Sequence, residues 1–132
     1  EPLVIYSAYR SYSYQQNHIG SSCKKNGYCA TEWESEHQSG LALDVFEATD
    51  ESTFLKRHQK HYDWLATHAH LYGFHQSYQK WLKTDGYYVE PWHWRFVWVW
   101  FATFLKERQM TFSEYFNSRM KRKNIPNIKR LP

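Results

Sequence analysis

The sequence predicts an α+β fold, in which a small antiparallel sheet packs against helices along one face. Two short apolar segments, residues 3–9 and 40–46, read as strands bounded by polar and turn-forming residues. A longer segment, residues 53–72, instead repeats its apolar residues at helical spacing, and Gly73 follows it as a helix C-cap. Strands and helices that follow one another in this irregular order are typical of an α+β domain.

The remaining elements follow from local signals along the chain. In order, we expect a strand (3–9), a short helix ending by residue 20, a polar loop (21–35), a strand (40–46), a long helix (53–72), a short strand (74–78), a turn (83–86), third and fourth strand segments (87–99), a helix (101–108) and a last helix to about residue 120. Ser13 with Gln16 has capping-box spacing for the short helix, and Thr111 with Glu114 has it for the last.

The composition fits one globular domain over residues 1–132, with a basic tail at about 121–132 that we expect to be solvated. With 42% hydrophobic and 20% aromatic residues, the chain can bury one core and is not disordered. No apolar run is long enough to span a bilayer. The net charge of +4 fits anionic surroundings such as a cell wall, a lipid surface or nucleic acid, and an ordinary basic surface equally well.

Cysteine and histidine residues outside the main motifs give weaker signals. Cys23 and Cys29 lie in the polar loop, where either a disulfide or two free thiols are consistent with the sequence. A cysteine-based zinc site is disfavoured because there are no further cysteines to complete it. His58 and His61 are three residues apart on the long helix, but we expect them on a polar helix face rather than on a metal.

The segment around His37 and Asp44 contains the first residues that could bind a metal ion. After Gly40 the chain alternates, so that residues 41, 43 and 45 point one way and residues 42, 44 and 46 the other. A carboxylate in the middle of so apolar a strand is costly unless its charge is compensated. A metal ion held by the carboxylate of Asp44 and the imidazole of His37 would supply that compensation.

A second motif supplies the missing ligand, because His93 follows Glu90 by three residues. His37, Asp44 and His93 give three protein ligands and leave a fourth position for water, the pattern of a catalytic zinc. Glu90 is then the natural general base. Taken singly, each histidine could be an ordinary core residue, and Glu90 could simply pair with Arg95. Phosphate-binding glycine-rich loops, serine-hydrolase elbows and His-Glu-x-x-His helices are absent from the sequence.

Together these motifs resemble the zinc D-alanyl-D-alanine carboxypeptidases of the VanY type. That family belongs to the LAS group, named for lysostaphin, the D-Ala-D-Ala peptidases and hedgehog. The resemblance covers about residues 5–116. It is carried by three separated motifs in the right order: Ser7-Ala8-Tyr9-Arg10-Ser11 with Gln15, Ser35-x-His37-x-x-Gly40-x-Ala42-x-Asp44, and Glu90-x-Trp92-His93-x-Arg95. Gly73-Phe74 with Ser77-Tyr78 also matches.

The resemblance implies a LAS-type fold and a role for each matching residue. By this resemblance, His37, Asp44 and His93 are expected to bind Zn²⁺. It also implies that Glu90 acts as the base and then as the acid for the leaving amine, and that Arg10 holds the scissile carbonyl oxygen. The residues expected to bind the substrate peptide are Arg10, Gln15 and Ser35.

We therefore expect a zinc metallopeptidase that hydrolyses the terminal D-alanine of bacterial peptidoglycan stem peptides. An L,D-carboxypeptidase, a D-Ala-D-Ala dipeptidase and, less well supported, a cross-link endopeptidase are the enzymatic alternatives. The alternative from another class is a catalytically silent wall-binding module, although such a module has no need of Glu90. We expect an extracytoplasmic, monomeric protein without a nucleic-acid partner. The start directly at a strand, with no visible signal peptide, leads us to expect a processed chain.

Overall fold

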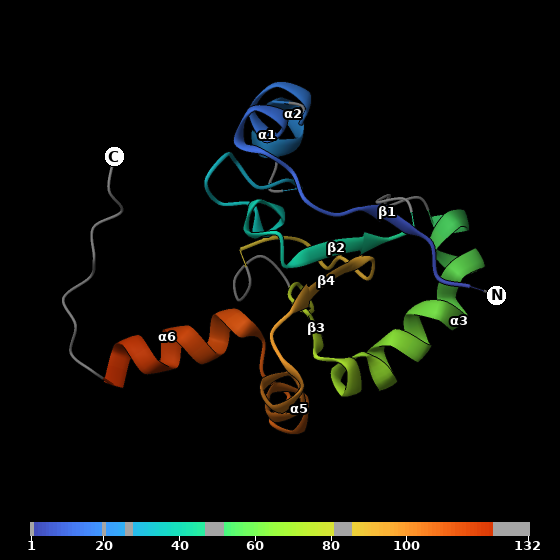
Figure 1. Ribbon diagram of the computed structural model, residues 1–132, viewed down its shortest axis with the longest axis vertical. Coiled ribbons are helices and arrows are strands. Elements are labelled where there is room, and N and C mark those ends of the chain that lie inside the picture. The colour runs from blue at the N-terminus through green and yellow to red at the C-terminus, as the bar shows by residue number, and fades with distance from the viewer. Residues whose placement is uncertain (1, 20, 26–27, 47–51, 81–85, 123–132) are drawn as a thin grey trace.

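The computed structural model describes residues 2–19, 21–25, 28–46, 52–80 and 86–122, and Figure 1 shows how their elements are arranged. Four short strands form one sheet: β1 (Ile5–Ser7), β2 (Ala42–Val45), β3 (Phe74–Gln76) and β4 (His93–Phe96). Their order across the sheet is β1-β2-β4-β3, and each neighbouring pair is antiparallel. The predicted α+β class with a small antiparallel sheet is therefore confirmed.

Helices surround this sheet on several sides (Figure 1). In that view α1 (Tyr12–His18) and α2 (Ser21–Lys25) lie together at the top, and α3 (Ser52–His68) curves along the right. Below the sheet lies α5 (Val99–Glu107), from which α6 (Phe112–Arg122) extends to the left. Two 3-10 helices, η1 (Glu36–Ser39) and η2 (Ala69–Tyr72), lead the chain into β2 and β3 respectively.

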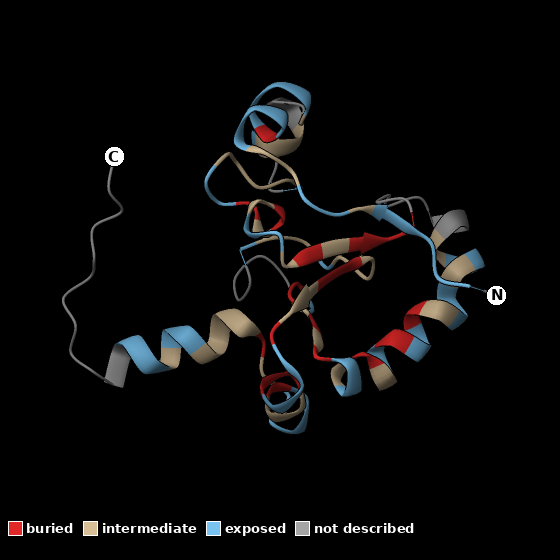
Figure 2. Ribbon diagram, viewed as in Figure 1, coloured by how far each residue is buried: buried red, intermediate tan, exposed pale blue. Residues whose placement is uncertain are grey.

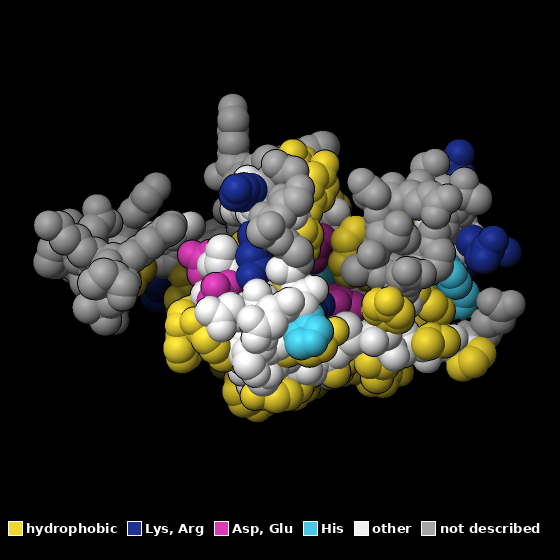
Figure 3. All heavy atoms as spheres, turned by 90° about the horizontal axis from the view of Figure 1, so that it is seen from above, with side chains coloured by type: hydrophobic (Ala, Val, Ile, Leu, Met, Phe, Trp, Pro, Cys, Tyr) yellow, Lys and Arg dark blue, Asp and Glu magenta, His cyan; other side chains and the backbone are white. Residues whose placement is uncertain are grey.

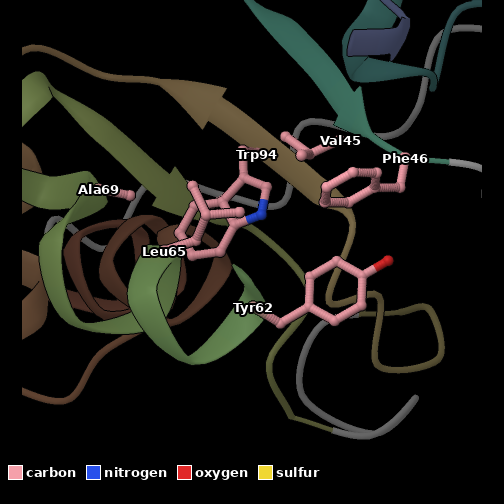
Figure 4. Close-up of a cluster of buried hydrophobic side chains, with 6 residues drawn as sticks. All are labelled: Val45, Phe46, Tyr62, Leu65, Ala69 and Trp94. Atoms are coloured by element: carbon pink, nitrogen blue, oxygen red, sulfur yellow. The ribbon is translucent and has the colours of Figure 1, made fainter. Parts of the chain in front are cut away.

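The main core lies between α3 and the two central strands, where Figure 2 shows the buried residues concentrated. Its buried members, drawn in Figure 4, are Val45, Phe46, Tyr62, Leu65, Ala69 and Trp94. The three from α3 and η2 recur at spacings of three and four residues, so one helix face meets the sheet. Burial of each large apolar side chain contributes about 1.5–3 kcal/mol. The indole nitrogen of Trp94 stays satisfied because it donates to the Pro91 carbonyl at 2.9 Å.

A second apolar cluster joins α5 to α6. Its buried residues are Val97, Phe101, Ala102 and Leu105, against which Phe112 and Tyr115 of α6 pack. The predicted capping box opens α6, because the Glu114 carboxylate accepts from the Thr111 amide at 2.8 Å and the Thr111 hydroxyl accepts from the Glu114 amide at 3.2 Å. This prediction is confirmed.

Gly73 ends η2 in the left-handed conformation, with φ of 83°, as the sequence predicts. Its amide donates to the carbonyl of His70 at 3.1 Å, and the chain then turns into β3. A Cβ at this position would lie 2.7 Å from a ring carbon of Phe96. Both the backbone angle and the space therefore require glycine here.

Two expectations for the N-terminal half are corrected. The N-cap of α1 is Ser11, whose hydroxyl accepts from the Tyr14 amide at 3.1 Å, and not Ser13. The supposed polar loop at 21–35 contains the helix α2. A disulfide joins Cys23 to Cys29 in this region, which decides between the two thiol states that the sequence left open.

Further corrections concern the strands and the packing of α3. Residues 87–99 contain one strand rather than two, since only β4 is formed there. Phe46 has a positive φ of 65°, which breaks the predicted alternation and places its ring in the same cluster as Val45. His58 and His61 do not lie on a purely polar face, because their ring centroids approach that of Phe46 to 4.0 and 4.9 Å.

Two expected features lie mainly outside the described residues, namely the turn at 83–86 and the basic tail at about 121–132. Within the part of the chain that is described, no helix has the length and apolar character needed to cross a membrane.

We predict that Gly73→Ala destabilises the protein more than Gly86→Ala. Both glycines have φ near 84°, at 83° and 84°, but only at Gly73 would the added Cβ meet another side chain. The backbone strain costs about 1–3 kcal/mol at either site, and overpacking against Phe96 adds a further ~1–3 kcal/mol. Thermal unfolding of both variants tests this. Equal shifts in Tm would show that Phe96 moves aside freely.

Candidate metal centre and active site

Three buried side chains, His37, Asp44 and His93, meet at one place in the structure. They come from η1, β2 and β4, and their exposed fractions are 3%, 1% and 3%. One nitrogen or oxygen atom from each lies within 4.8 Å of the others. The structure thus brings together the residues that the sequence motifs predict as metal ligands, although they are spread over 57 positions of the chain.

The register of the sheet explains how this convergence arises. Asp44 and His93 are directly paired across β2 and β4, so their side chains leave the sheet on the same face. His37 precedes Gly40, whose φ of 72° ends η1 and turns the chain into β2. The backbone carbonyl of His37 also accepts from the Arg10 amide at 3.3 Å, which ties this turn to the segment after β1.

Side-chain contacts define which atom of each residue faces the common point. The Nδ1 of His37 lies 2.6 Å from the Ala8 carbonyl and therefore carries the proton, so Nε2 is unprotonated and can act as a ligand. In the structure this Nε2 also lies 3.1 Å from Nη2 of Arg10. That Nε2 is 3.2 Å from Asp44 Oδ1 and 3.2 Å from His93 Nδ1. His93 Nδ1 is in turn 3.1 Å from Asp44 Oδ1. Two imidazole nitrogens and one carboxylate oxygen form a donor set that suits a zinc ion.

Charges around Asp44 compensate its burial. Burial by itself would raise the pKa of this carboxyl, but its interactions with His37 and His93 outweigh burial and hold the pKa well below its usual range. Arg10 adds an ion pair, with Nη2 at 2.6 Å from Asp44 Oδ2, while its Nε donates to the Ser7 hydroxyl at 3.0 Å. Asp44 itself is buried, and the acidic and basic side chains that lie next to each other in Figure 3 belong to the outer surface of the face that it views.

Two glutamates flank His93 in opposite environments. Glu90 Oε2 lies 3.9 Å from Nδ1, the nitrogen that faces the other ligands, and burial raises the pKa of Glu90 to about 7. Glu36 Oε2 lies 2.9 Å from Nε2, on the far side of the ring. Burial would raise the pKa of Glu36 as well, but hydrogen bonds from His93 and Ser77 and the charge of Arg95 lower it to about 2. Glu90 can therefore exchange a proton near neutral pH, whereas Glu36 stays charged.

The structure also places the two remaining predicted site residues. Gln15 is fully buried, and its amide nitrogen donates to the Ala30 carbonyl at 2.7 Å. Ser35 is 9% exposed and immediately precedes η1, where its carbonyl accepts from the Gln38 amide at 3.1 Å. Both lie in the segments that carry Arg10 and His37, and their role toward a substrate stays a prediction.

Sequence reasoning missed the residues behind His93. Arg95 pairs with Glu36 at 2.8 Å rather than with Glu90, the partner that the sequence suggested. Ser77 donates to the same carboxylate at 2.6 Å, and the ring of Tyr78 stacks on that of His93 with centroids 4.9 Å apart. Two features of the sequence could have revealed these residues. Glu36 is adjacent to the predicted ligand His37. Arg95 follows the predicted ligand His93 by two positions and therefore lies on the same face of the strand.

Comparison with known proteins identifies a family of carboxypeptidases to which this chain is similar. The sequence model of the family described as D-alanyl-D-alanine carboxypeptidase, VanY, matches residues 2–99. The chain belongs to the VanY family. A curated D-alanyl-D-alanine carboxypeptidase of Enterococcus faecium is 30% identical over 128 residues, which cover 93% of this chain and 39% of that protein. The chain thus spans less than half the length of this relative.

Solved structures of the same kind share the fold. The LdcB LD-carboxypeptidase is 31% identical, with a TM-score of 0.72, over 87% of this chain and 58% of that chain. A mutant of a vancomycin-resistance D,D-pentapeptidase VanY in complex with Zn(II) is 28% identical, with a TM-score of 0.66, over 87% and 71% of the two chains. These likenesses confirm the LAS-type fold that the motifs imply.

Outside the ligand group, His75 on β3 is a third buried histidine, and its environment differs from that of His93. It is 5% exposed, and burial lowers its pKa to about 4, although the charge of Glu36 opposes the shift. His75 therefore remains neutral at pH values where a histidine of the unfolded chain takes up a proton.

We predict that His75 makes the folded state less stable as the pH falls. Its folded-state pKa lies below the unfolded value of 6.5, so its contribution is complete above pH 6.5 and is lost on acidification toward pH 4. Between pH 7 and pH 5 this loss amounts to about 2 kcal/mol.

Urea unfolding of the wild type and of His75→Gln at both pH values measures the effect. The variant should lose less stability between pH 7 and pH 5 than the wild type does. An identical loss in the two proteins would contradict the assignment.

Proposed function

We propose that this chain is a zinc-dependent D,D-carboxypeptidase that removes the terminal D-alanine from peptidoglycan stem peptides. The observation that carries the proposal is the convergence of three buried ligand atoms with the Glu90 carboxyl beside them. Membership of the VanY family supports the substrate class, and the Zn(II) complex of a family member supports the metal.

The metal would be held by Nε2 of His37, Oδ1 of Asp44 and Nδ1 of His93, the atoms that face one another. When bound, a zinc ion with an open fourth position lowers the pKa of a water ligand to about 7 and polarises a carbonyl oxygen. The burial of the three residues excludes bulk water from the ligand group and strengthens the electrostatic interactions within it.

Glu90 would move the protons in this reaction. With a pKa raised to about 7, its carboxylate takes a proton from the attacking water at neutral pH and then gives it to the nitrogen of the leaving D-alanine. A carboxyl group with the ordinary pKa would be a much weaker acid catalyst for the second of these transfers.

Arg10 would stabilise the negative charge that develops on the scissile carbonyl oxygen. Its guanidinium is fixed at the edge of the ligand group by Ser7 and Asp44, so it needs little reorganisation during the reaction. Gln15 and Ser35 would hold the substrate peptide near its C-terminal carboxylate, with Gln15 acting from a buried position that also supports the Ala30 backbone.

An L,D-carboxypeptidase is the second candidate, because the similarity to the LdcB LD-carboxypeptidase reaches a TM-score of 0.72. In both cases the enzyme would act as a monomer outside the cytoplasm, where the Cys23–Cys29 disulfide is stable.

Mass spectrometry of a stem pentapeptide and a stem tetrapeptide after incubation distinguishes these functions. We expect the pentapeptide to lose one alanine, and a chelator to abolish this loss, because hydrolysis would require the bound metal. Loss from the tetrapeptide alone would establish the L,D-carboxypeptidase, and loss of a dipeptide would establish a dipeptidase. If zinc is bound and neither peptide is cleaved, the proposal of a carboxypeptidase is wrong.

We predict that Glu90→Gln retains the metal and loses turnover by a factor of about 10²–10⁴ or more, because the amide cannot accept the proton. Zinc content and kcat should be measured on the same preparation. Glu107→Gln, on the exposed surface of α5, is the matched control and should leave both unchanged. A Glu90→Gln variant with near wild-type kcat would remove Glu90 from the mechanism.

A further inference from the structure

Glu36 contacts His93 at the nitrogen that points away from the other ligands. Its Oε2 lies 2.9 Å from Nε2, whereas Nδ1 of the same ring faces Asp44 and His37 at 3.1 and 3.2 Å. Because the two ring nitrogens lie on different edges of the imidazole, Glu36 is on the side opposite the ligand group. It is therefore placed neither as a further ligand nor as a base for the reaction there.

Glu36 is itself held in place from two directions. Arg95 donates from Nη1 to Oε1 at 2.8 Å, and the Ser77 hydroxyl donates to Oε2 at 2.6 Å. Arg95 lies two residues after His93 on β4, so both side chains leave the same face of the strand. The guanidinium of Arg95 also sits over the Phe112 ring, with its central carbon 4.4 Å from the centroid. The carboxylate that contacts His93 thus has a fixed orientation.

The ring of His93 is fixed in a third direction by Tyr78. The two rings stack at an interplanar angle of 26° with centroids 4.9 Å apart. Both the edge and the face of the imidazole therefore have defined partners, and the ring cannot flip its nitrogens without losing the bond to Glu36.

We propose that Glu36 is a positioning residue, which accepts a hydrogen bond from Nε2–H of His93 and thereby keeps Nδ1 free to bind the metal. A carboxylate in this place fixes the tautomer of a ligand histidine and makes its other nitrogen a more basic, stronger ligand for the metal. This inference deepens the proposed function, since it concerns the same metal site. Its consequence is that Glu36 raises the affinity of the site for zinc.

The test is the dissociation constant for Zn²⁺ of the metal-free protein, measured by competition with a chromophoric chelator. Glu36→Gln keeps the size of the side chain and removes its charge, so we expect it to bind zinc about 10–100-fold more weakly. Glu34→Gln is the matched control: it is also a nearby glutamate, but its carboxylate accepts from the Thr31 hydroxyl, at 2.8 Å, and it should stay within about twofold of the wild type.

Ser77→Ala provides a second variant in case Glu36→Gln does not fold, as judged by far-UV circular dichroism. It removes one donor to Glu36 and leaves the charge, so zinc binding should weaken by about threefold or more. Unchanged affinity in a folded Glu36→Gln, or in Ser77→Ala where that variant is the one that folds, overturns the role of Glu36 and leaves the proposed function intact. A wild-type protein that does not bind zinc overturns both.

Discussion

A carboxylate buried in an apolar strand is the constraint on which the rest of this structure depends. Asp44 is 1% exposed, and such burial is costly unless partners offset the charge. The partners come from three segments of the chain, with Arg10 after β1, His37 in η1 and His93 on β4. The left-handed turn at Gly40 and the antiparallel pairing of β2 with β4 are the features that bring them to Asp44.

The division between the two glutamates follows from what surrounds each of them. Glu36 is matched by Arg95, Ser77 and His93, and it stays charged. Glu90 is buried nearby with weaker compensation, so its pKa rises to about 7. One carboxylate is thus suited to hold a ring in place and the other to move a proton. The same residue type serves both purposes because burial and pairing act on the pKa in opposite directions.

Much of this could be predicted from the sequence, and the failures have physical reasons. The site could be predicted because each of its residues belongs to a short motif, with His37 and Asp44 in one and Glu90 and His93 in another. The helix caps at Gly73 and Thr111 could be predicted because they depend on neighbours within a few residues. The pairing of Glu36 with Arg95 joins positions 59 residues apart and depends on strand register, which local patterns do not encode. Likewise, Phe46 has a positive φ and packs in the core cluster with Tyr62 and Leu65 of α3, a combination that has no signature in the sequence.

The most direct measurement is anomalous diffraction at the zinc absorption edge from crystals of the protein purified without a chelator. A single peak within coordination distance, about 2.0–2.2 Å, of His37 Nε2, Asp44 Oδ1 and His93 Nδ1 is the result that we predict. It would show that the buried carboxylate and the two imidazoles form one metal site. A map with no peak at these three atoms, from a protein that cleaves its peptide substrate, would contradict the assignment of a metal to Asp44.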